Sequence, residues 1–243
     1  IAEKKKAKIL YDEDFVDPVW KDRPALSEEP AFDLDEKYAG ESVSSKMARI
    51  RKEMEDAGCN THIVSTLDDT CWTLNIRGND IEFFPLVLSY AIIRMDRFDL
   101  YIDERKLDKA LQEKLAKDGV VLHPYNAIYE DVKKLSDRDI VMIDPSKLNY
   151  ALFNNIPKSV KTVEKRNPAI LMKAIKNPVE IENIRKAQIK DSVAHLRFMK
   201  WLKENIGKIK ITEMSAAAKL DEFRAEMGNF IRPSFEPISS FGP

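Results

Sequence analysis

The sequence predicts an α/β domain with a largely buried sheet, joined to a helix-rich segment. Two observations lead to this class. Short apolar runs typical of strands alternate with helical patterns over about 120 residues from Ser42 onward. The pattern changes at Pro168, beyond which two long helical stretches follow. With 243 residues, 44% of them hydrophobic, the chain is long enough to bury a real core.

Composition and charge narrow the classes of function. Lys and Arg total 40 against 41 Asp and Glu, so no charge excess favours nucleic acid or an anionic membrane. The Lys4–Lys8 cluster is interpreted as a solvated terminal segment rather than a binding arm, because nearby acidic residues neutralise it. No apolar run approaches the ~18 residues that a membrane span requires. We therefore expect neither a nucleic-acid partner nor a membrane partner.

The two cysteines, Cys59 and Cys71, indicate the redox compartment. They are too few and too irregularly spaced for a disulfide framework or a Cys-rich zinc site. We expect both to be reduced thiols in a cytoplasmic protein.

Residues 1–39 are predicted to form a connector. Pro18, Pro24 and Pro30 occur among acidic residues with little periodicity, which favours an extended chain lying across a surface. We expect Trp20 and Phe32 to pack against the protein's own domain and hold the connector there.

The elements of the α/β part are predicted from local signals. A cap at Ser42 or Ser44, an apolar stripe through Met47 and Met54, and a stop at Gly58 predict a helix. Two apolar runs around 95–97 predict a hairpin of 87–94 with 98–102. The other predicted strands are 61–65, 120–122, 140–143 and 159–163, and the other predicted helices are 67–75, 108–117 and 125–134.

The helix-rich segment is predicted to hold two helices and a closing strand. Asn177 as cap, Pro178 at the first position and Glu180 in the first turn predict a helix over 178–205. A second helix is predicted over 212–227, with Thr212 as its cap. The chain then reads as a strand up to its last residue.

Candidate catalytic residues are scarce. His62, His123 and His195 lie on different predicted elements without the spacing of a metal site, so each is interpreted as a surface or hydrogen-bonded structural histidine. Asp68 and Asp69 could coordinate a cation, but we interpret them as first-turn carboxylates that favour the helix dipole. The sequence contains no Gly-rich phosphate loop and no Gly-x-Ser-x-Gly turn. We assign no catalytic residue and no metal-binding residue in this chain.

The predicted helix 178–205 contains an unusual polar pair. At about 100° per residue its apolar stripe runs from Ile184 to Leu202, and Asp191 falls near the centre of that stripe. His195 follows one turn later and can hydrogen-bond to the carboxylate, since a buried carboxylate needs a partner. An acid/base pair is one interpretation. We favour a structural polar pair that links this helix to a neighbouring domain or subunit.

The segment 72–80 is the other dense motif. Trp72, Arg77 and the turn at Gly78 could line a peptide-binding cleft. They could also form a helix end, with Arg77 bonding the last carbonyls or pairing with Asp80. The residues alone favour the structural interpretation.

Several segments together carry a family resemblance. They are 17–24 with 38–40, 65–80, 171–177 with 180–187, and 238–243. In this order they resemble three-domain Xaa-Pro aminopeptidases (aminopeptidase P). There they would be the linker, the middle domain, the opening helix of the catalytic domain and the strand before its first active-site histidine. The resemblance covers nearly the whole chain.

The resemblance implies a fold and a domain order. Residues 1–39 would be an interdomain connector, and 40–165 a creatinase-N-like (ribonuclease H-like) α/β middle domain with a mixed sheet. Residues 166–243 would be the start of a pita-bread α+β catalytic domain. Since the chain begins at Ile1 and stops before the first metal ligand of that fold, we expect a fragment without the N-terminal domain and most of the catalytic domain.

The resemblance also implies an activity for the parent protein. It would release the N-terminal residue from peptides with proline second, by attack of a hydroxide that bridges two divalent metals, usually Mn²⁺. Peptide would be its substrate and a homodimer its assembly. All metal ligands would lie after Pro243, so the fragment is expected to bind no metal and to be inactive.

The resemblance implies three residues near the substrate pocket. Phe235 lies where related enzymes place residues near the pocket for the substrate's first side chain, and Trp72 and Arg77 belong to the domain that overhangs the cleft. Two alternatives stay open, a prolidase- or creatinase-type hydrolase and a non-catalytic pita-bread binding protein. Two Asp, one His and two Glu downstream would identify an enzyme, and their absence would favour the binding protein.

Overall fold

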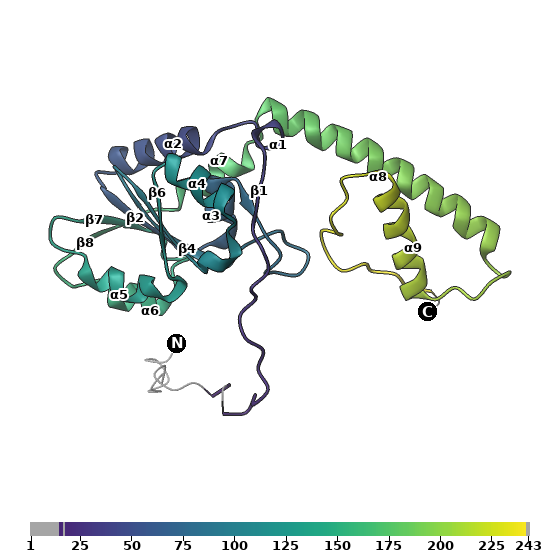
Figure 1. Cartoon of the computed structure of the whole chain (residues 1–243), viewed down its shortest axis with the longest axis horizontal. Coiled ribbons are helices and arrows are strands. Elements are labelled where there is room, and N and C mark those ends of the chain that lie inside the picture. Colours follow the sequence, from purple (N-terminus) through teal and green to yellow (C-terminus); the bar gives the residue numbers. More distant parts are fainter. Residues whose placement is uncertain (1–14, 17, 242–243) are drawn as a thin grey trace, which may run out of the picture.

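The computed structural model describes residues 15–16 and 18–241. They form an α/β domain from which one long helix leads away to a second, shorter helix (Figure 1). The Lys4–Lys8 cluster, Asp17 and the last two residues of the predicted closing strand lie outside the described residues.

A mixed six-stranded sheet lies at the centre of the α/β domain. Its strands are β2 (Thr61–Val64), β4 (Ser89–Arg94), β5 (Phe98–Ile102), β6 (Val120–His123), β7 (Ile140–Ile143) and β8 (Lys161–Glu164). The order is β6-β5-β4-β2-β7-β8. β4 is antiparallel to both β2 and β5, whereas the β5–β6, β2–β7 and β7–β8 pairs are parallel. The predicted α/β class with a mixed sheet and the predicted hairpin are confirmed.

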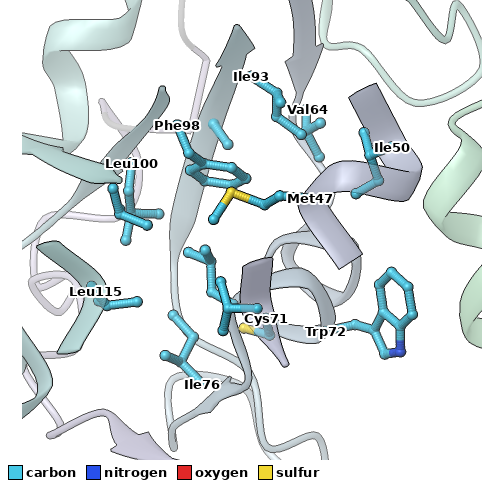
Figure 2. Close-up of a cluster of buried hydrophobic side chains, with 14 of the residues drawn as sticks. Met47, Ile50, Val64, Cys71, Trp72, Ile76, Ile93, Phe98, Leu100 and Leu115 are labelled. Atoms are coloured by element: carbon cyan, nitrogen blue, oxygen red, sulfur yellow. The ribbon is translucent and has the colours of Figure 1, made fainter. Parts of the chain in front are cut away.

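Two apolar clusters cover the two faces of the sheet. One holds α2 (Val43–Asp56), α3 (Leu67–Leu74), α4 (Lys109–Lys117) and α7 (Pro168–Ala174) against side chains such as Phe98 and Leu100 (Figure 2). The other packs Tyr101 and Ile143 under α5 (Ile128–Asp131) and α6 (Tyr150–Asn155). Successive residues of β5 thus enter opposite clusters, as the pleat of a strand requires.

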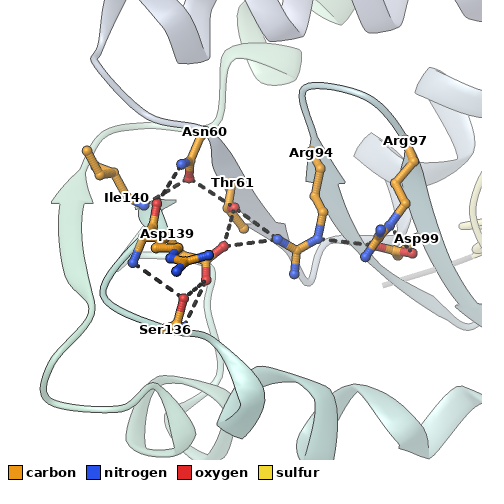
Figure 3. A network of polar contacts seen from close by, with 9 residues as sticks. Asn60, Thr61, Arg94, Arg97, Asp99, Ser136, Asp139 and Ile140 are labelled. Atoms are coloured by element: carbon orange, nitrogen blue, oxygen red, sulfur yellow. Dashed lines mark hydrogen bonds and ion pairs between the residues drawn. The ribbon is translucent and has the colours of Figure 1, made fainter.

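Charged and polar side chains link the ends of neighbouring strands on one side of the sheet, where the strands begin or finish (Figure 3). Arg94 of β4 donates to Asp139 at 3.0 Å and lies 3.4 Å from Asp99 of β5. Arg97 donates to the same Asp99 carboxylate at 3.0 Å. Asn60, just before β2, accepts from the backbone N–H that begins β7 at 2.9 Å. These contacts fix β2, β4, β5 and β7 in register where the apolar clusters end.

The connector is held by its C-terminal part, which corrects the prediction for Trp20. That side chain is 47% exposed, and the Arg23 guanidinium lies 5.7 Å from its ring centroid. Phe32 is half-buried in β1 (Phe32–Asp33), which pairs with β3 (Ile76–Arg77), and α1 (Glu36–Ala39) follows. Strands of two residues carry no alternation, so the periodicity of the sequence could not reveal them.

The two long helices have the ends that their capping residues predict. Asn177 accepts from the Glu180 N–H at 2.9 Å at the start of α8 (Pro178–Asn205), and Thr212 caps α9 (Glu213–Glu226). Among the described elements, α8 contacts chiefly α9 and α1. None of the helices in the described part of the chain is long and apolar enough to cross a membrane.

The predicted closing strand is wrong as far as Phe241. Residues 227–241 contain no helix or strand, and Ile238 and Phe241 are 93% and 89% exposed. A strand needs a neighbour for its backbone groups, and the strands of the described sheet all come from 61–164. The Phe241 N–H donates instead to the Glu213 carboxylate at 2.8 Å.

A substitution at Met47 tests how much the larger apolar cluster contributes to stability. Its side chain is 0% exposed, so Met47→Ala would leave a cavity, and we expect the free energy of unfolding to fall by about 2–5 kcal/mol. The matched control is Met95→Ala in the turn between β4 and β5. The Met95 side chain is 42% exposed, so this change should alter the free energy of unfolding by less than about 0.5 kcal/mol. Urea unfolding followed by circular dichroism measures both. Equal losses would contradict this core.

Candidate functional site

Trp72 and Arg77 face the interior of the domain rather than a cleft. Trp72 is 6% exposed, and the Lys46 Nζ atom lies 4.5 Å from its ring centroid. Arg77 Nη1 donates to the carbonyls of Cys71 at 3.0 Å and Ile76 at 2.9 Å, and burial lowers the Arg77 pKa. Arg77 therefore ties β3 to α3, whereas the Trp72 ring packs on Lys46 of α2.

Phe235 is not brought to these two residues. It is 69% exposed and belongs to the irregular segment after α9. In Figure 1 this segment lies beside α9, away from α3 and the sheet. The three residues implied near a substrate pocket are therefore separated in this chain.

Asp191 has a different partner from the predicted one. Its carboxylate accepts from Arg224 Nε of α9 at 2.8 Å, and Arg224 also donates to Asp221. His195 is exposed, with its ring 6.3 Å from that of Phe198. The predicted pair was drawn from one helix alone, whereas the packing of α9 brings a permanent cation to Asp191.

A cavity of about 680 Å³ opens at the carboxyl ends of β2, β7 and β8. Open α/β sheets commonly bind ligands at this edge of their parallel strands. The lining residues are Thr66, Asp68, Asp69, Asp144, Pro145, Ser146, Lys147, Glu164, Lys165, Arg166, Ile170 and Lys173. Four acidic side chains in this set face four basic ones, so the lining has no excess of either charge.

Three of the four acidic groups of the cavity, Asp68, Asp69 and Asp144, are used within the protein. Lys173 of α7 forms ion pairs with Asp68 and, at 2.8 Å, with Asp69. Asp144 accepts from the Ser146 hydroxyl at 2.6 Å; although burial raises the pKa of Asp144, its hydrogen bonds lower it below the ordinary value. These carboxylates already have partners, which is a poor fit to an open metal site. Among residues 15–16 and 18–241, no group of three or more His, Cys, Asp or Glu side chains could hold a metal ion.

Asn167 is the centre of a buried hydrogen-bond network beneath this cavity. Its amide donates to Asp69 at 2.9 Å, and its Oδ1 accepts from the Ala169 N–H at 3.0 Å, which caps α7. Its own N–H donates to Asp144 at 3.0 Å, and His62 Nε2 lies 3.3 Å from the same Oδ1. The network ties α7 to α3, β2 and the end of β7.

Both ring nitrogens of His62 face acceptor oxygens. Nδ1 lies 3.0 Å from the Met142 carbonyl and Nε2 faces Asn167 Oδ1. A neutral imidazole has one N–H, so only one of the two contacts can be a hydrogen bond in that state. Burial is the larger effect and lowers the His62 pKa, against the opposing effects of these acceptors, Asp69 and Asp144.

Sequence reasoning missed Asn167 and Lys46. Asn167-Pro168 has the same cap-then-proline signal as Asn177-Pro178, so the start of α7 could have been found. No local signal shows that Asp69, far away in the sequence, lies beneath it. Nor does any signal distinguish Lys46, 2% exposed, from its neighbours on the same helix.

This element order defines a class of protein, an α/β domain of the creatinase/prolidase type followed by the first helices of a second domain. The profile of the creatinase/prolidase N-terminal domain family matches residues 22–180, and that of metallopeptidase family M24 matches residues 182–243. The chain belongs to the creatinase/prolidase N-terminal domain family and is a homologue of the Xaa-Pro aminopeptidases P.

Individual relatives agree with this family. The probable Xaa-Pro aminopeptidase P of Neurospora crassa is 36% identical over 96% of this chain, which spans 36% of that relative. Xaa-Pro aminopeptidase 1 of Dictyostelium discoideum is 35% identical over 99% of the chain and 40% of the relative. The chain thus spans less than half the length of these relatives.

Solved structures agree as well. The X-prolyl aminopeptidase of Caenorhabditis elegans, described as a cytosolic enzyme with a di-nuclear active site, matches with a TM-score of 0.90 and 30% identity. The match covers 96% of this chain and 39% of that structure. The Xaa-Pro dipeptidase of Bacillus anthracis, 16% identical with a TM-score of 0.56 over 77% of this chain and 50% of its own, shares the fold. The predicted family resemblance and fold are confirmed.

His62 predicts a pH dependence of stability. Because its pKa is lower in the folded chain, the stability that neutral His62 contributes is present above the ordinary pKa of about 6.5 and lost as pH falls below it. We expect the free energy of unfolding to decrease from about pH 6.5 to about pH 5, and His62→Gln to flatten that slope. His195→Gln, at an exposed position, is the control and should keep the slope. Stability that rises on acidification in this window, measured by urea unfolding, would contradict a neutral His62.

Proposed function

We propose that this chain is the connector, middle domain and first catalytic-domain helices of a metal-dependent Xaa-Pro aminopeptidase. The whole protein would release the N-terminal residue from peptides with proline at the second position. The observation that supports this most is the 0.90 TM-score to the Caenorhabditis elegans X-prolyl aminopeptidase over 96% of the chain, at 30% identity. The likeness to the Bacillus anthracis dipeptidase, at 16% identity, supports the fold but not a dipeptidase activity.

The proposal divides the chain at residues 39 and 165. Residues 1–39 are the connector, 40–165 the creatinase-N-like domain and 166–243 the start of the pita-bread domain. Two divalent metals, Mn²⁺ in our proposal, act in the whole protein, which works as a cytoplasmic homodimer on peptide substrates. The described residues offer no fitting ligand set, so we assign no metal contact and no catalytic step to them. The 243-residue chain alone is proposed to be inactive.

The exposed apolar side chains of α8 support the proposal that another layer of protein covers this helix in the whole protein. One side of the helix packs on α9, where Asp191 pairs with Arg224 and Arg197 pairs with Glu226. The other side exposes an apolar stripe spaced by three and four residues: Ile189 66%, Val193 37%, Leu196 68% and Met199 38%. A helix that packs on one side and is apolar on the other is expected to lie between two layers of protein. In the proposed whole protein the second layer is the rest of the peptidase domain.

Peptide hydrolysis tests the proposed activity. We expect the longer protein that contains this chain to cleave a peptide with proline second and to spare the same peptide with alanine second. Mn²⁺ should restore activity after removal of metal by a chelator, because the hydroxide nucleophile depends on the metals. The pure 243-residue chain is expected to show no turnover with added Mn²⁺. A folded longer protein without turnover would support a non-catalytic binding protein instead, and turnover by the short chain would refute its proposed inactivity.

The exposed stripe of α8 gives a second test. In the 243-residue chain we expect Leu196→Glu to reduce self-association and binding of a hydrophobic dye, since it places a charge at the centre of the stripe. In the longer protein the same change should lower stability by roughly 2–5 kcal/mol, because the charge would be buried without a partner. Lys109→Glu, at an exposed position of α4 in the α/β domain, is the control. Light scattering and thermal unfolding provide the readouts; an unaffected longer protein would contradict a layer on this side of α8.

A further inference from the structure

Lys46 is a buried cation with no carboxylate partner among the described residues. It is 2% exposed, and its Nζ atom donates to the Trp72 carbonyl at 2.8 Å and to Asn75 Oδ1 at 2.6 Å. The same atom lies 4.5 Å from the centroid of the Trp72 ring. Two neutral acceptors and an aromatic face thus surround the ammonium group.

Asn75 links Lys46 to the chain on either side of α1. It ends α3 in the left-handed conformation, with a φ of 52°, and its side-chain amide donates to the Glu41 carbonyl at 2.9 Å. Its own carbonyl accepts from the Leu34 N–H at 2.7 Å. Lys46 binds the Oδ1 atom of this amide, so it fixes which way the amide points. The chain is therefore held on both sides of α1, at Leu34 in the connector and at Glu41 just after it.

Gly40, next to Glu41, touches the first turn of α8. Its φ is 69°, and a Cβ atom at this position would lie 2.2 Å from Asn177 Oδ1 and 2.7 Å from Val179 Cβ. Asn177, the cap of α8, donates to the Ala39 carbonyl at 2.8 Å. Asn183, one turn further along α8, donates to the carbonyl that begins this stretch, at Lys37, also at 2.8 Å. We call residues 37–40 with Asn177 and Asn183 the α1–α8 junction.

We propose that Lys46 is a positioning residue: through Asn75 and Glu41 it holds the α1–α8 junction in place and so fixes the direction in which α8 leaves the α/β domain. Apart from the short link from α7, this junction is where α8 meets the described α/β domain (Figure 1). The inference concerns the geometry of this chain and stands whether or not the proposed peptidase activity does.

The protonation state of Lys46 gives this role a distinctive signature. Burial, the largest effect, lowers the Lys46 pKa to about 8. Arg77 of β3 and Arg49 of α2 act in the same direction, whereas Glu41, just before α2, and Glu180 of α8 oppose it. Lys46 is therefore mostly charged at about pH 7 and mostly neutral at about pH 9.5. A neutral amine is a weaker donor to its two acceptors, so the junction should loosen across this range.

Distance measurements between spin labels test the proposal in the 243-residue chain. Lys117→Cys at the end of α4 and Lys200→Cys on α8 provide exposed label sites, while Cys59 and Cys71 are buried. At about pH 7 we expect one narrow distance distribution, which broadens as pH rises, with a midpoint near 8. Lys46→Met should give the broad distribution at both pH values and abolish the pH response.

The control is Lys52→Met on the same helix, which removes an exposed ion pair with Asp56 and should leave the distribution narrow and its response to pH intact. A folded Lys46→Met variant with a narrow distribution would overturn the proposal. If circular dichroism shows that Lys46→Met does not fold, the pH series of the unsubstituted chain decides. An unchanged distribution up to about pH 9.5 then overturns the proposal, and reversible broadening with intact circular dichroism supports it.

Discussion

The burial of α3 is the constraint on which the placement of the following helices depends. Most of its surface lies in the apolar core, so its polar groups must find partners within the protein. At its N-terminal end Asp69 binds Asn167 and thereby holds α7. At its C-terminal end Asn75 donates to the carbonyl of Glu41, next to the α1–α8 junction. The short helix α3 thus anchors α7, which precedes α8 in the chain, and the segment around α1, which contacts the start of α8.

Two buried lysines differ in how their charge is compensated, because one has a carboxylate partner and the other has only neutral acceptors. Lys106 forms an ion pair with Asp80 at 2.6 Å, with both side chains almost fully buried, so its charge is neutralised where it lies. Lys46 has only amide and carbonyl oxygens and the Trp72 ring. Burying a cation costs free energy unless a partner compensates it, and dipoles compensate less than a full charge. Burial without a carboxylate partner lowers the Lys46 pKa to about 8.

The sequence predicted the elements that carry strong local signals and missed those that depend on distant contacts. Helices α2, α4, α8 and α9 each begin after a residue whose side chain caps the helix, and such residues can be recognised in the sequence. The pairing of β4 with β5 follows from two apolar runs around a short turn. The β1–β3 pair has two residues a side and no periodicity. In the candidate site, Asp68 and Asp69 were placed correctly in a first turn, but their partner Lys173 comes from a helix about a hundred positions later.

The motif at 72–80 shows why residue type alone gives a poor guide to a binding site. An aromatic ring, a guanidinium and a glycine turn suggest a peptide cleft, yet the Trp72 ring covers Lys46 and Arg77 binds backbone carbonyls. Gly78 is needed because a Cβ atom there would lie 2.6 Å from the Val87 side chain. Arg77 thus holds β3 against α3, and Trp72 packs α3 on Lys46 of α2. A change at Trp72 is therefore expected to act through its contact with Lys46 and so on the direction in which α8 leaves the α/β domain.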